Sequence, residues 1–138
     1  MMAYVRVISA LAILVFAALP AWATPDQPIS VERLTGSWDV SLYYSPDAPP
    51  SSTEMVIDGT GQDGQLSGSF YGSGFAPDSR ATERDGATAF IAVTRDGTGE
   101  YIHSGRLGAD DMIEGQTLSR GRGFLMTWTA RRTAEKPE

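Results

Sequence analysis

The chain of 138 residues contains no cysteine and a single histidine, His103. Without cysteine it cannot form disulfides, on which small exported domains commonly depend. One histidine without cysteine also cannot supply the clustered ligands of a zinc site. The fold must therefore be stabilised by a well-packed core, and the sequence predicts no metal site and no other cofactor.

Long hydrophobic runs are absent as well. The longest apolar segment, Val7–Leu19, is shorter than the roughly 20 residues that a membrane-spanning helix needs. It follows Arg6 and precedes Ala21–Ala23, a small-x-small pattern that signal peptidase accepts. These features predict a signal peptide over residues 1–23, and no cysteine follows for lipid attachment. We expect a periplasmic or secreted protein without stable membrane insertion after cleavage.

Positive charge is scarce. The chain has 11 Lys and Arg against 17 Asp and Glu, a net charge of −6 with histidine neutral. Removal of residues 1–23, which include Arg6, changes this to −7. Such acidity argues against nucleic acid and anionic membranes as partners. The remaining residues, 24–138, suffice for one domain.

Sustained helical periodicity is also missing. The only predicted helical piece is a single turn over Val31–Leu34, inside an N-terminal leader of residues 24–35. Elsewhere apolar and polar residues alternate with period two between turn signals. Asp-Gly is the strongest short signal for a tight hairpin, because glycine and, less readily, aspartate accept positive φ. Four such pairs occur, Asp58-Gly59, Asp63-Gly64, Asp85-Gly86 and Asp96-Gly97.

The pattern predicts an all-β protein with eight antiparallel strands. A meander of this kind usually closes into an up-and-down barrel, because closure removes exposed strand edges. We therefore predict a β-barrel domain over residues 36–132 and a C-terminal tail over 133–138. The predicted strands are Trp38–Tyr44, Thr53–Asp58, Gln65–Tyr71, Arg80–Glu83, Thr88–Arg95, Glu100–Leu107, Met112–Ser119 and Phe124–Arg131.

Gly36-Ser37-Trp38 resembles the opening of a calycin, the superfamily of lipocalins, fatty-acid-binding proteins and avidins. The resemblance covers the barrel domain and implies an eight-stranded calycin-like barrel. It also implies that a basic residue of the last strand packs over Trp38 at the closed end. Arg131 and Arg132 are both available, and strand parity favours Arg132, which shares a face with Trp128.

Among the calycins, avidins are similar to this chain in the sequence pattern of two strands. The segments Asp63–Gly68 and Ser104–Leu107 resemble their third and sixth strands. Their biotin pocket, however, needs a polar residue two positions after the first-strand tryptophan, where this chain has Val40. It also needs several mid-chain tryptophans that this chain lacks. We therefore expect no biotin binding.

Connection lengths locate a candidate site. Successive connections of an up-and-down barrel alternate between its two ends, so the two longest, Ser45–Ser52 and Gly72–Ser79, share one end. Functional sites favour adjustable loops on a rigid frame. Aromatic and arginine side chains gather at the same end, although ion pairing with nearby carboxylates explains the arginines equally well. The expected ligand-binding residues are Tyr44, Tyr71, Arg95, Tyr101 and Arg120.

No constellation of nucleophile, acid and base is visible, so we expect no enzyme and no catalytic residue. His103 is expected to be a partly buried, hydrogen-bonded side chain. Two functions remain open. One is binding of a small, partly apolar and possibly anionic ligand at the long-loop end. The other is an envelope protein-interaction module or inhibitor, which should have a solid core and an exposed apolar patch instead of a cavity.

Overall fold

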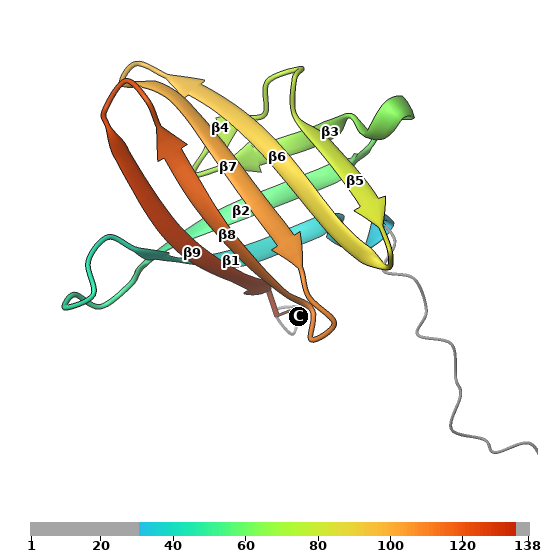
Figure 1. The fold of residues 1–138 in the computed structure, drawn as a ribbon, viewed down its shortest axis with the longest axis horizontal. Coiled ribbons are helices and arrows are strands. Elements are labelled where there is room, and N and C mark those ends of the chain that lie inside the picture. The colour runs from blue at the N-terminus through green and yellow to red at the C-terminus, as the bar shows by residue number, and fades with distance from the viewer. Residues whose placement is uncertain (1–30, 135–138) are drawn as a thin grey trace, which may run out of the picture.

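The computed structural model describes residues 31–134, which form a single sheet of nine antiparallel strands (Figure 1). The predicted signal peptide, most of the leader and residues 135–138 lie outside the described residues. In the described part, no helix is long and apolar enough to cross a membrane. The elements are η1 (Val31–Leu34), β1 (Gly36–Tyr43), β2 (Ser51–Thr60), η2 (Gln62–Gly64), β3 (Leu66–Phe70), β4 (Ser73–Gly74), β5 (Arg80–Arg84), β6 (Ala87–Asp96), β7 (Gly99–Leu107), β8 (Met112–Ser119) and β9 (Phe124–Arg132).

Each predicted strand has a counterpart, and the additional strand is β4. Tyr71 and Gly72 both adopt positive φ, 53° and 77°, and so turn the chain sharply at the end of β3. Ser73-Gly74 then pairs back with β3. The sequence pattern extended the third strand through Tyr71, because nothing local distinguishes a tyrosine in the left-handed region from one in a strand. The predicted helical turn at Val31–Leu34 is present as the 3₁₀ helix η1.

The Asp-Gly pairs differ in what they do. Asp85-Gly86, with φ of 53° and 74°, joins β5 to β6 as a two-residue hairpin turn. Asp58-Gly59 instead lies inside β2, where the register with β3 shifts between Ile57 and Gly59. Its expected turn is therefore wrong: the extra residue is absorbed as a bulge, and the chain reverses later, around Asp63-Gly64.

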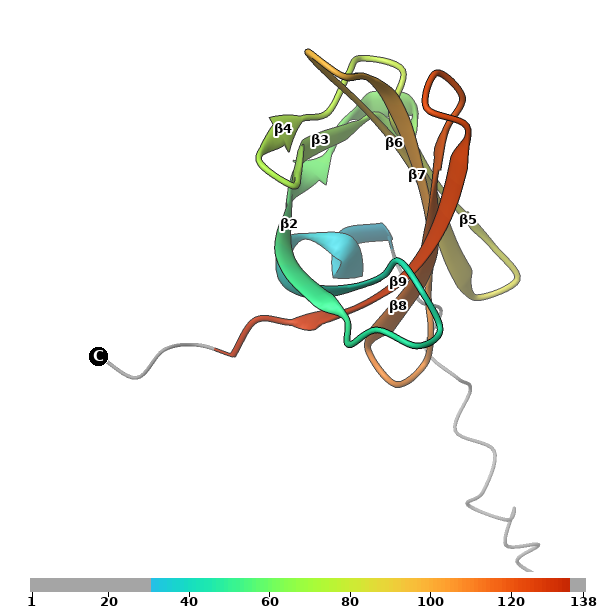
Figure 2. The same ribbon diagram turned by 90° about the vertical axis from the view of Figure 1, so that its left-hand side faces the viewer.

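The strand order is β4-β3-β2-β1-β9-β8-β7-β6-β5, so the first and last long strands are neighbours. Trp38 of β1 pairs in register with Arg132 of β9. The sheet curls around its inner face, as the end-on view in Figure 2 shows. It is not closed into a barrel by hydrogen bonds, because β4 and β5 form two separate edges. The closed eight-stranded barrel predicted from the sequence is corrected to a curled nine-stranded sheet.

The seam between the two edges is occupied by the segment that precedes β5. β5 begins at Arg80, opposite Ile91, so the remainder of β6 lies beyond its reach. There Ala76 N donates to Val93 O (2.7 Å), and Val93 N donates to Ser79 Oγ (2.9 Å). Pro77, in the middle of this segment, has no N–H to contribute to a ladder. The seam therefore has isolated hydrogen bonds in place of paired strands.

The inner face carries one continuous apolar core. Alternate residues of the strands point inward, as the period-two pattern predicts. The largest buried side chains are Trp38, Trp128, Phe70, Leu34, Leu42 and Met55. The core is concentrated toward the end where β1 begins and η1 covers the sheet, and the opposite end carries the longer connections.

A tryptophan and an arginine close the end beside η1. Trp38 is fully buried, and its Nε1 donates to the carbonyl oxygen of Leu34 (2.8 Å). The guanidinium carbon of Arg132 lies 4.5 Å from the centre of the indole, and Arg132 Nη1 donates to Thr35 O (2.9 Å). Gly36 has φ of 129°, and a Cβ there would lie 2.9 Å from Arg132 Nη1. The Gly-x-Trp pattern thus has a steric reason in this fold.

Candidate functional site

A cavity of about 400 Å³ lies at the end of the sheet opposite η1. Four connections contribute to it: Tyr44 comes from the β1–β2 connection, Tyr71 from the one after β3, Thr98 from the β6–β7 turn and Arg122 from the β8–β9 turn. Both long connections therefore reach the same cavity. This is the arrangement that alternation of connections along an antiparallel meander produces.

The walls of the cavity are apolar. Leu42, Phe70, Phe124 and Met126 line it from inward positions of β1, β3 and β9. A concave, mainly apolar surface with a few polar groups is the usual form of a small-molecule site. The arrangement can therefore hold an apolar body and orient it through a small number of hydrogen bonds.

The structure brings together three of the five expected site residues. Tyr44, Tyr71 and Tyr101 line the cavity, whereas Arg95 and Arg120 do not. Arg95 alternates along β6 with Thr94 and Asp96, which do line it, so its side chain lies on the outer face. Arg95 Nε donates to Glu100 Oε2 (2.8 Å), a bond that raises the pKa of Arg95, and Nη2 donates to Asp78 (3.3 Å).

Arg122 is the arginine at the cavity. Arg120 follows the buried Ser119 and is exposed, whereas Arg122 reaches back from the β8–β9 turn to the rim. Its guanidinium carbon lies 5.4 Å from the ring centre of Phe124, and its Nη1 donates to the hydroxyl of Tyr101 (3.2 Å). Arg122 lies two residues after Arg120 in the same connection, and nothing local in the sequence separates the two.

The rim joins the β6–β7 turn to the β8–β9 turn. The Tyr101 hydroxyl contacts Thr98 Oγ1 and accepts a hydrogen bond from Arg122 Nη1. Asp96 Oδ1 accepts from Thr98 Oγ1 (2.6 Å) and Thr98 N (2.7 Å), and both bonds lower the pKa of Asp96. The rim thus holds an arginine and a carboxylate that do not form a direct ion pair with each other.

His103 lies on the floor of the cavity. It is 4% exposed, and its ring is stacked on Phe70 with 4.1 Å between ring centres. Its Nε2 is 2.9 Å from Thr94 Oγ1 and its Nδ1 is 2.7 Å from Thr117 Oγ1. Burial lowers the pKa of His103 to about 4, so the ring is neutral at pH 7. The predicted hydrogen bonding of His103 is confirmed, whereas the ring is buried and not partly buried as expected.

Thr94 and Thr117 are the polar floor residues that sequence reasoning missed. Both are almost fully buried, and both line the cavity together with His103. The sequence signal for them was the alternation of inward and outward positions along a strand, which places both threonines on the inner face. A threonine on an inward position is also common in cores, so this alternation alone does not mark these two as site residues.

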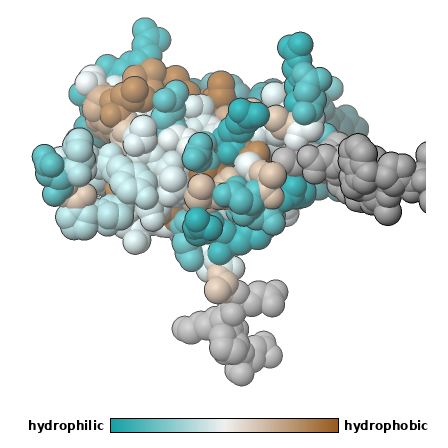
Figure 3. All heavy atoms as spheres, turned by 60° about the horizontal axis from the view of Figure 1, so that its bottom comes forward, coloured by the Kyte–Doolittle hydropathy of each residue, from teal (hydrophilic) through white to brown (hydrophobic). Residues whose placement is uncertain are grey.

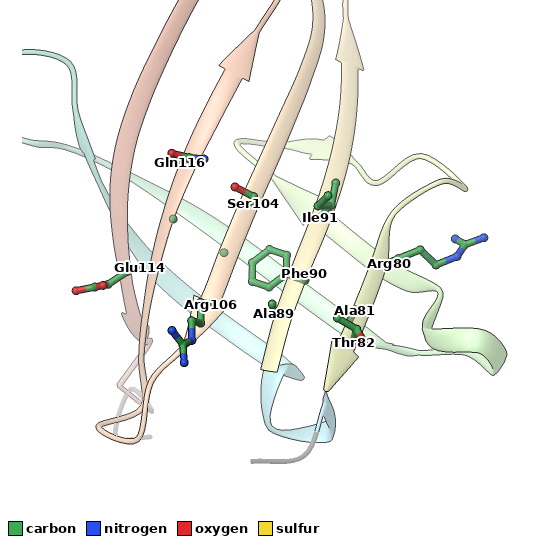
Figure 4. A pocket seen from close by; sticks show the side chains of 12 residues that line it. Arg80, Ala81, Thr82, Ala89, Phe90, Ile91, Ser104, Arg106, Glu114 and Gln116 are labelled. Carbon is green, nitrogen blue, oxygen red and sulfur yellow. The ribbon is translucent and has the colours of Figure 1, made fainter. Parts of the chain in front are cut away.

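A second hollow of about 580 Å³ lies on the outer face of β5 to β8 (Figure 4). Its shape comes from small residues, among them Ala89, Ser104 and the glycines 105 and 115. Arg106 and Glu114 border it from opposite positions of β7 and β8. It is larger than the cavity at the end of the sheet opposite η1, which we call the mouth cavity. However, this second hollow is an open depression on a sheet face, away from the long connections. We therefore regard the mouth cavity as the candidate site.

Residues 31–134 contain no group of three or more histidine, aspartate or glutamate side chains positioned to hold a metal ion. Comparisons of the chain with protein-family models, curated proteins and solved structures find no match.

Proposed function

We propose that this protein is an exported binding protein, not an enzyme, that takes a small, partly apolar ligand into the mouth cavity. The observation that carries the proposal is the cavity itself. Its volume of about 400 Å³ falls in the range of small-molecule sites, and its walls are largely apolar. Tyr44 and Tyr71 stand at its entrance with about two thirds of each residue exposed, available for contact with a ligand.

The proposal also covers the localisation of the protein and its fold family. Export to the periplasm or the exterior rests on the signal-peptide pattern, and exported material should begin at Thr24 by intact mass. Membership of the calycins is supported by Gly36, Trp38 and the packing of Arg132 on the indole. An experimental structure with Trp38 exposed at that end would contradict the calycin assignment.

Arg122 gives the site a preference for a ligand with an anionic outer end. Within the described residues Arg122 forms no ion pair, in contrast to Arg95, whose charge is matched by two carboxylates. A guanidinium at the rim can donate to a sulfonate, carboxylate or phosphate while the apolar part lies deeper. Asp96 on the same rim would in turn disfavour a second anionic group.

Fluorescence titration with 1-anilinonaphthalene-8-sulfonate, which is apolar at one end and anionic at the other, tests the proposal. We expect saturable binding of one probe per chain. Arg122→Gln should weaken it about twofold to fivefold, the effect of one exposed charge contact. Arg120→Gln is the matched control, because Arg120 lies two residues away and does not line the cavity.

The binding position needs its own readout, because this probe also adheres to apolar surfaces. His103 is the only histidine, so its ring signals in a ¹⁵N-histidine-labelled sample report on the cavity floor without further assignment. These signals should shift on saturation with the probe. Unchanged His103 signals, or equal effects of the two arginine variants, would refute binding in the mouth cavity.

The alternative, an envelope protein-interaction module or inhibitor, is favoured by an apolar strip on the outer face. Ile102, Leu118 and Leu125 lie side by side in register on β7, β8 and β9, with Leu118 40% and Leu125 62% exposed. Figure 3 shows that hydrophobic surface gathers in one area of the molecule. If this strip is the working surface, Leu125→Ser should abolish cross-linking to an envelope protein and leave probe binding unchanged. Undiminished cross-linking of this variant would refute the strip as the interaction surface.

A further inference from the structure

The direction of the hydrogen bonds on the cavity floor is set at one end by Trp128. The indole Nε1 can only donate, and it donates to Thr117 Oγ1 at 3.1 Å. Thr117 is 1% exposed, so its own hydroxyl proton needs an acceptor inside the protein. Among the described residues, the second partner of Thr117 Oγ1 is Nδ1 of His103, at 2.7 Å. The Thr117 hydroxyl therefore donates to Nδ1.

This assignment determines the tautomer of His103. A neutral imidazole carries one proton, so if Nδ1 accepts, the proton is on Nε2. Nε2–H then donates to Thr94 Oγ1, 2.9 Å away. The opposite tautomer would direct two donors at Thr117 Oγ1 and leave the buried Thr117 hydroxyl proton without an acceptor. Burial of an unsatisfied donor disfavours that arrangement.

Thr94 is the end of this chain of donors. Its oxygen accepts from His103, and within residues 31–134 its own hydroxyl proton has no acceptor. Thr94 also lines the mouth cavity. We propose that the Thr94 hydroxyl is a specificity-determining donor on the cavity floor, and that the ligand presents a neutral carbonyl oxygen to it. This inference rests on the proposed function, because it names the chemistry of the ligand end that enters first.

The surroundings of Thr94 explain why the acceptor is neutral. Its floor neighbours His103 and Thr117 are uncharged, and Phe70 and Met126 form the adjoining apolar wall. A carboxylate at this depth would be buried without a counter-ion, because the only arginine lining the cavity in the described residues, Arg122, lies in the β8–β9 turn at the rim and not on the floor. An ammonium group, which has no acceptor, would leave the Thr94 hydroxyl proton without a partner. A ketone, ester or amide carbonyl satisfies the hydroxyl without burying charge.

Nitrogen NMR of the free protein at neutral pH tests the donor direction without any ligand. The ring ¹⁵N shifts of a neutral histidine differ strongly between its two tautomers, and His103 is the only histidine in the chain. We expect the proton on Nε2. A proton on Nδ1 would make Thr94 an acceptor toward the cavity and would overturn the proposal.

Matched aromatic probes test the ligand class. Acetophenone carries a carbonyl, and ethylbenzene is a close match without one. The ratio of their dissociation constants should change about twofold to tenfold between the parent and Thr94→Val, the size of one net hydrogen bond, with acetophenone losing affinity. Thr94→Ser keeps the hydroxyl and should keep the parent ratio. An unchanged ratio in Thr94→Val would overturn the proposal.

The two experiments separate this inference from the proposed function. If neither probe binds the parent, the proposed function fails for aromatic ligands of this size. In that case the NMR measurement of the His103 tautomer alone tests whether the Thr94 hydroxyl donates toward the cavity. If both probes bind and the proton is on Nδ1, the cavity binds ligands but the Thr94 donor is refuted.

Discussion

At the scale of single residues, the aromatic core depends on two positions that have no side chain. Gly105 of β7 and Gly115 of β8 lie opposite each other in register. A Cβ at Gly105 would lie 2.6 Å from the ring of Phe90, and one at Gly115 would lie 2.2 Å from the ring of Trp128. Both contacts are shorter than carbon atoms tolerate. The rings of Phe90 and Trp128 therefore lie directly over strand backbone that only glycine leaves open.

The first prediction concerns Gly115→Ala. The added methyl group has to displace the Trp128 ring, which weakens its hydrogen bond to Thr117. Overpacking of a core in this way costs about 1–3 kcal/mol of the free energy of unfolding. Denaturant unfolding followed by tryptophan fluorescence measures it. Gly121→Ala is the control, because nothing lies within 4 Å of a Cβ at Gly121. Equal stability of the two variants would contradict this account.

At the scale of elements, η1 is attached to the sheet by side chains rather than by a ladder. Trp38 donates from β1 to η1, and Arg132 donates from the end of β9 to carbonyl oxygens of Arg33 and Thr35. Arg33 in turn forms an ion pair with Asp111 in the β7–β8 turn. These contacts join the first and last described elements, and so the closed end depends on residues nearly a hundred positions apart.

The second prediction is that Arg132→Met destabilises the protein by about 1–2 kcal/mol. It loses charge-assisted hydrogen bonds and the contact with the indole ring, while keeping an unbranched apolar side chain. Arg131→Met should leave stability nearly unchanged, because Arg131 is exposed on the opposite face of the same strand. Melting temperatures of the two variants give the comparison. An equal loss from both would mean that only net charge matters.

At the scale of the whole molecule, the curled sheet is filled at one end and open at the other. The filled end supplies the apolar burial that stabilises the fold without disulfides. The open end holds a polar floor that contributes less burial but can receive a ligand. His103 belongs to both, because its ring packs on the core and its nitrogens connect the floor threonines.

The third prediction is a loss of stability on acidification from about pH 6.5 to pH 4. Burial lowers the native pKa of His103 to about 4 from an unfolded value near 6.5. Between these values the unfolded chain binds a proton that the native state does not, so stability falls with falling pH by up to about 3 kcal/mol. Urea unfolding at pH 7.5, 6 and 5 measures this.

His103→Gln is the control for the acid effect, since glutamine does not titrate. The charged groups that share the cavity with His103 are Asp96 and Arg122, and they remain in the variant. Its stability should therefore decline less than that of the parent over the same pH range. Parallel pH profiles of parent and variant would show that carboxylates elsewhere cause the decline.

Most of the strands were predictable because their signals are local. Met112–Ser119 was predicted to the residue, and the inward faces of β1 and β9 follow from the alternation around Trp38 and Trp128. The cavity was predictable in position, because alternate connections meet at one end, but only in part in composition. Arg122 and Arg120 are equivalent in sequence terms, and only the path of the β8–β9 turn distinguishes them.

The antiparallel meander, its inward faces and the end at which the long connections gather follow from the amino-acid sequence, because alternation and turn chemistry act over a few residues. The open seam of the sheet and the bulge at Asp58-Gly59 arise from tertiary contacts. The same contacts bring Thr94, His103, Thr117 and Trp128 into one hydrogen-bonded chain. Those outcomes depend on contacts between strands distant in the chain, for which no local pattern exists.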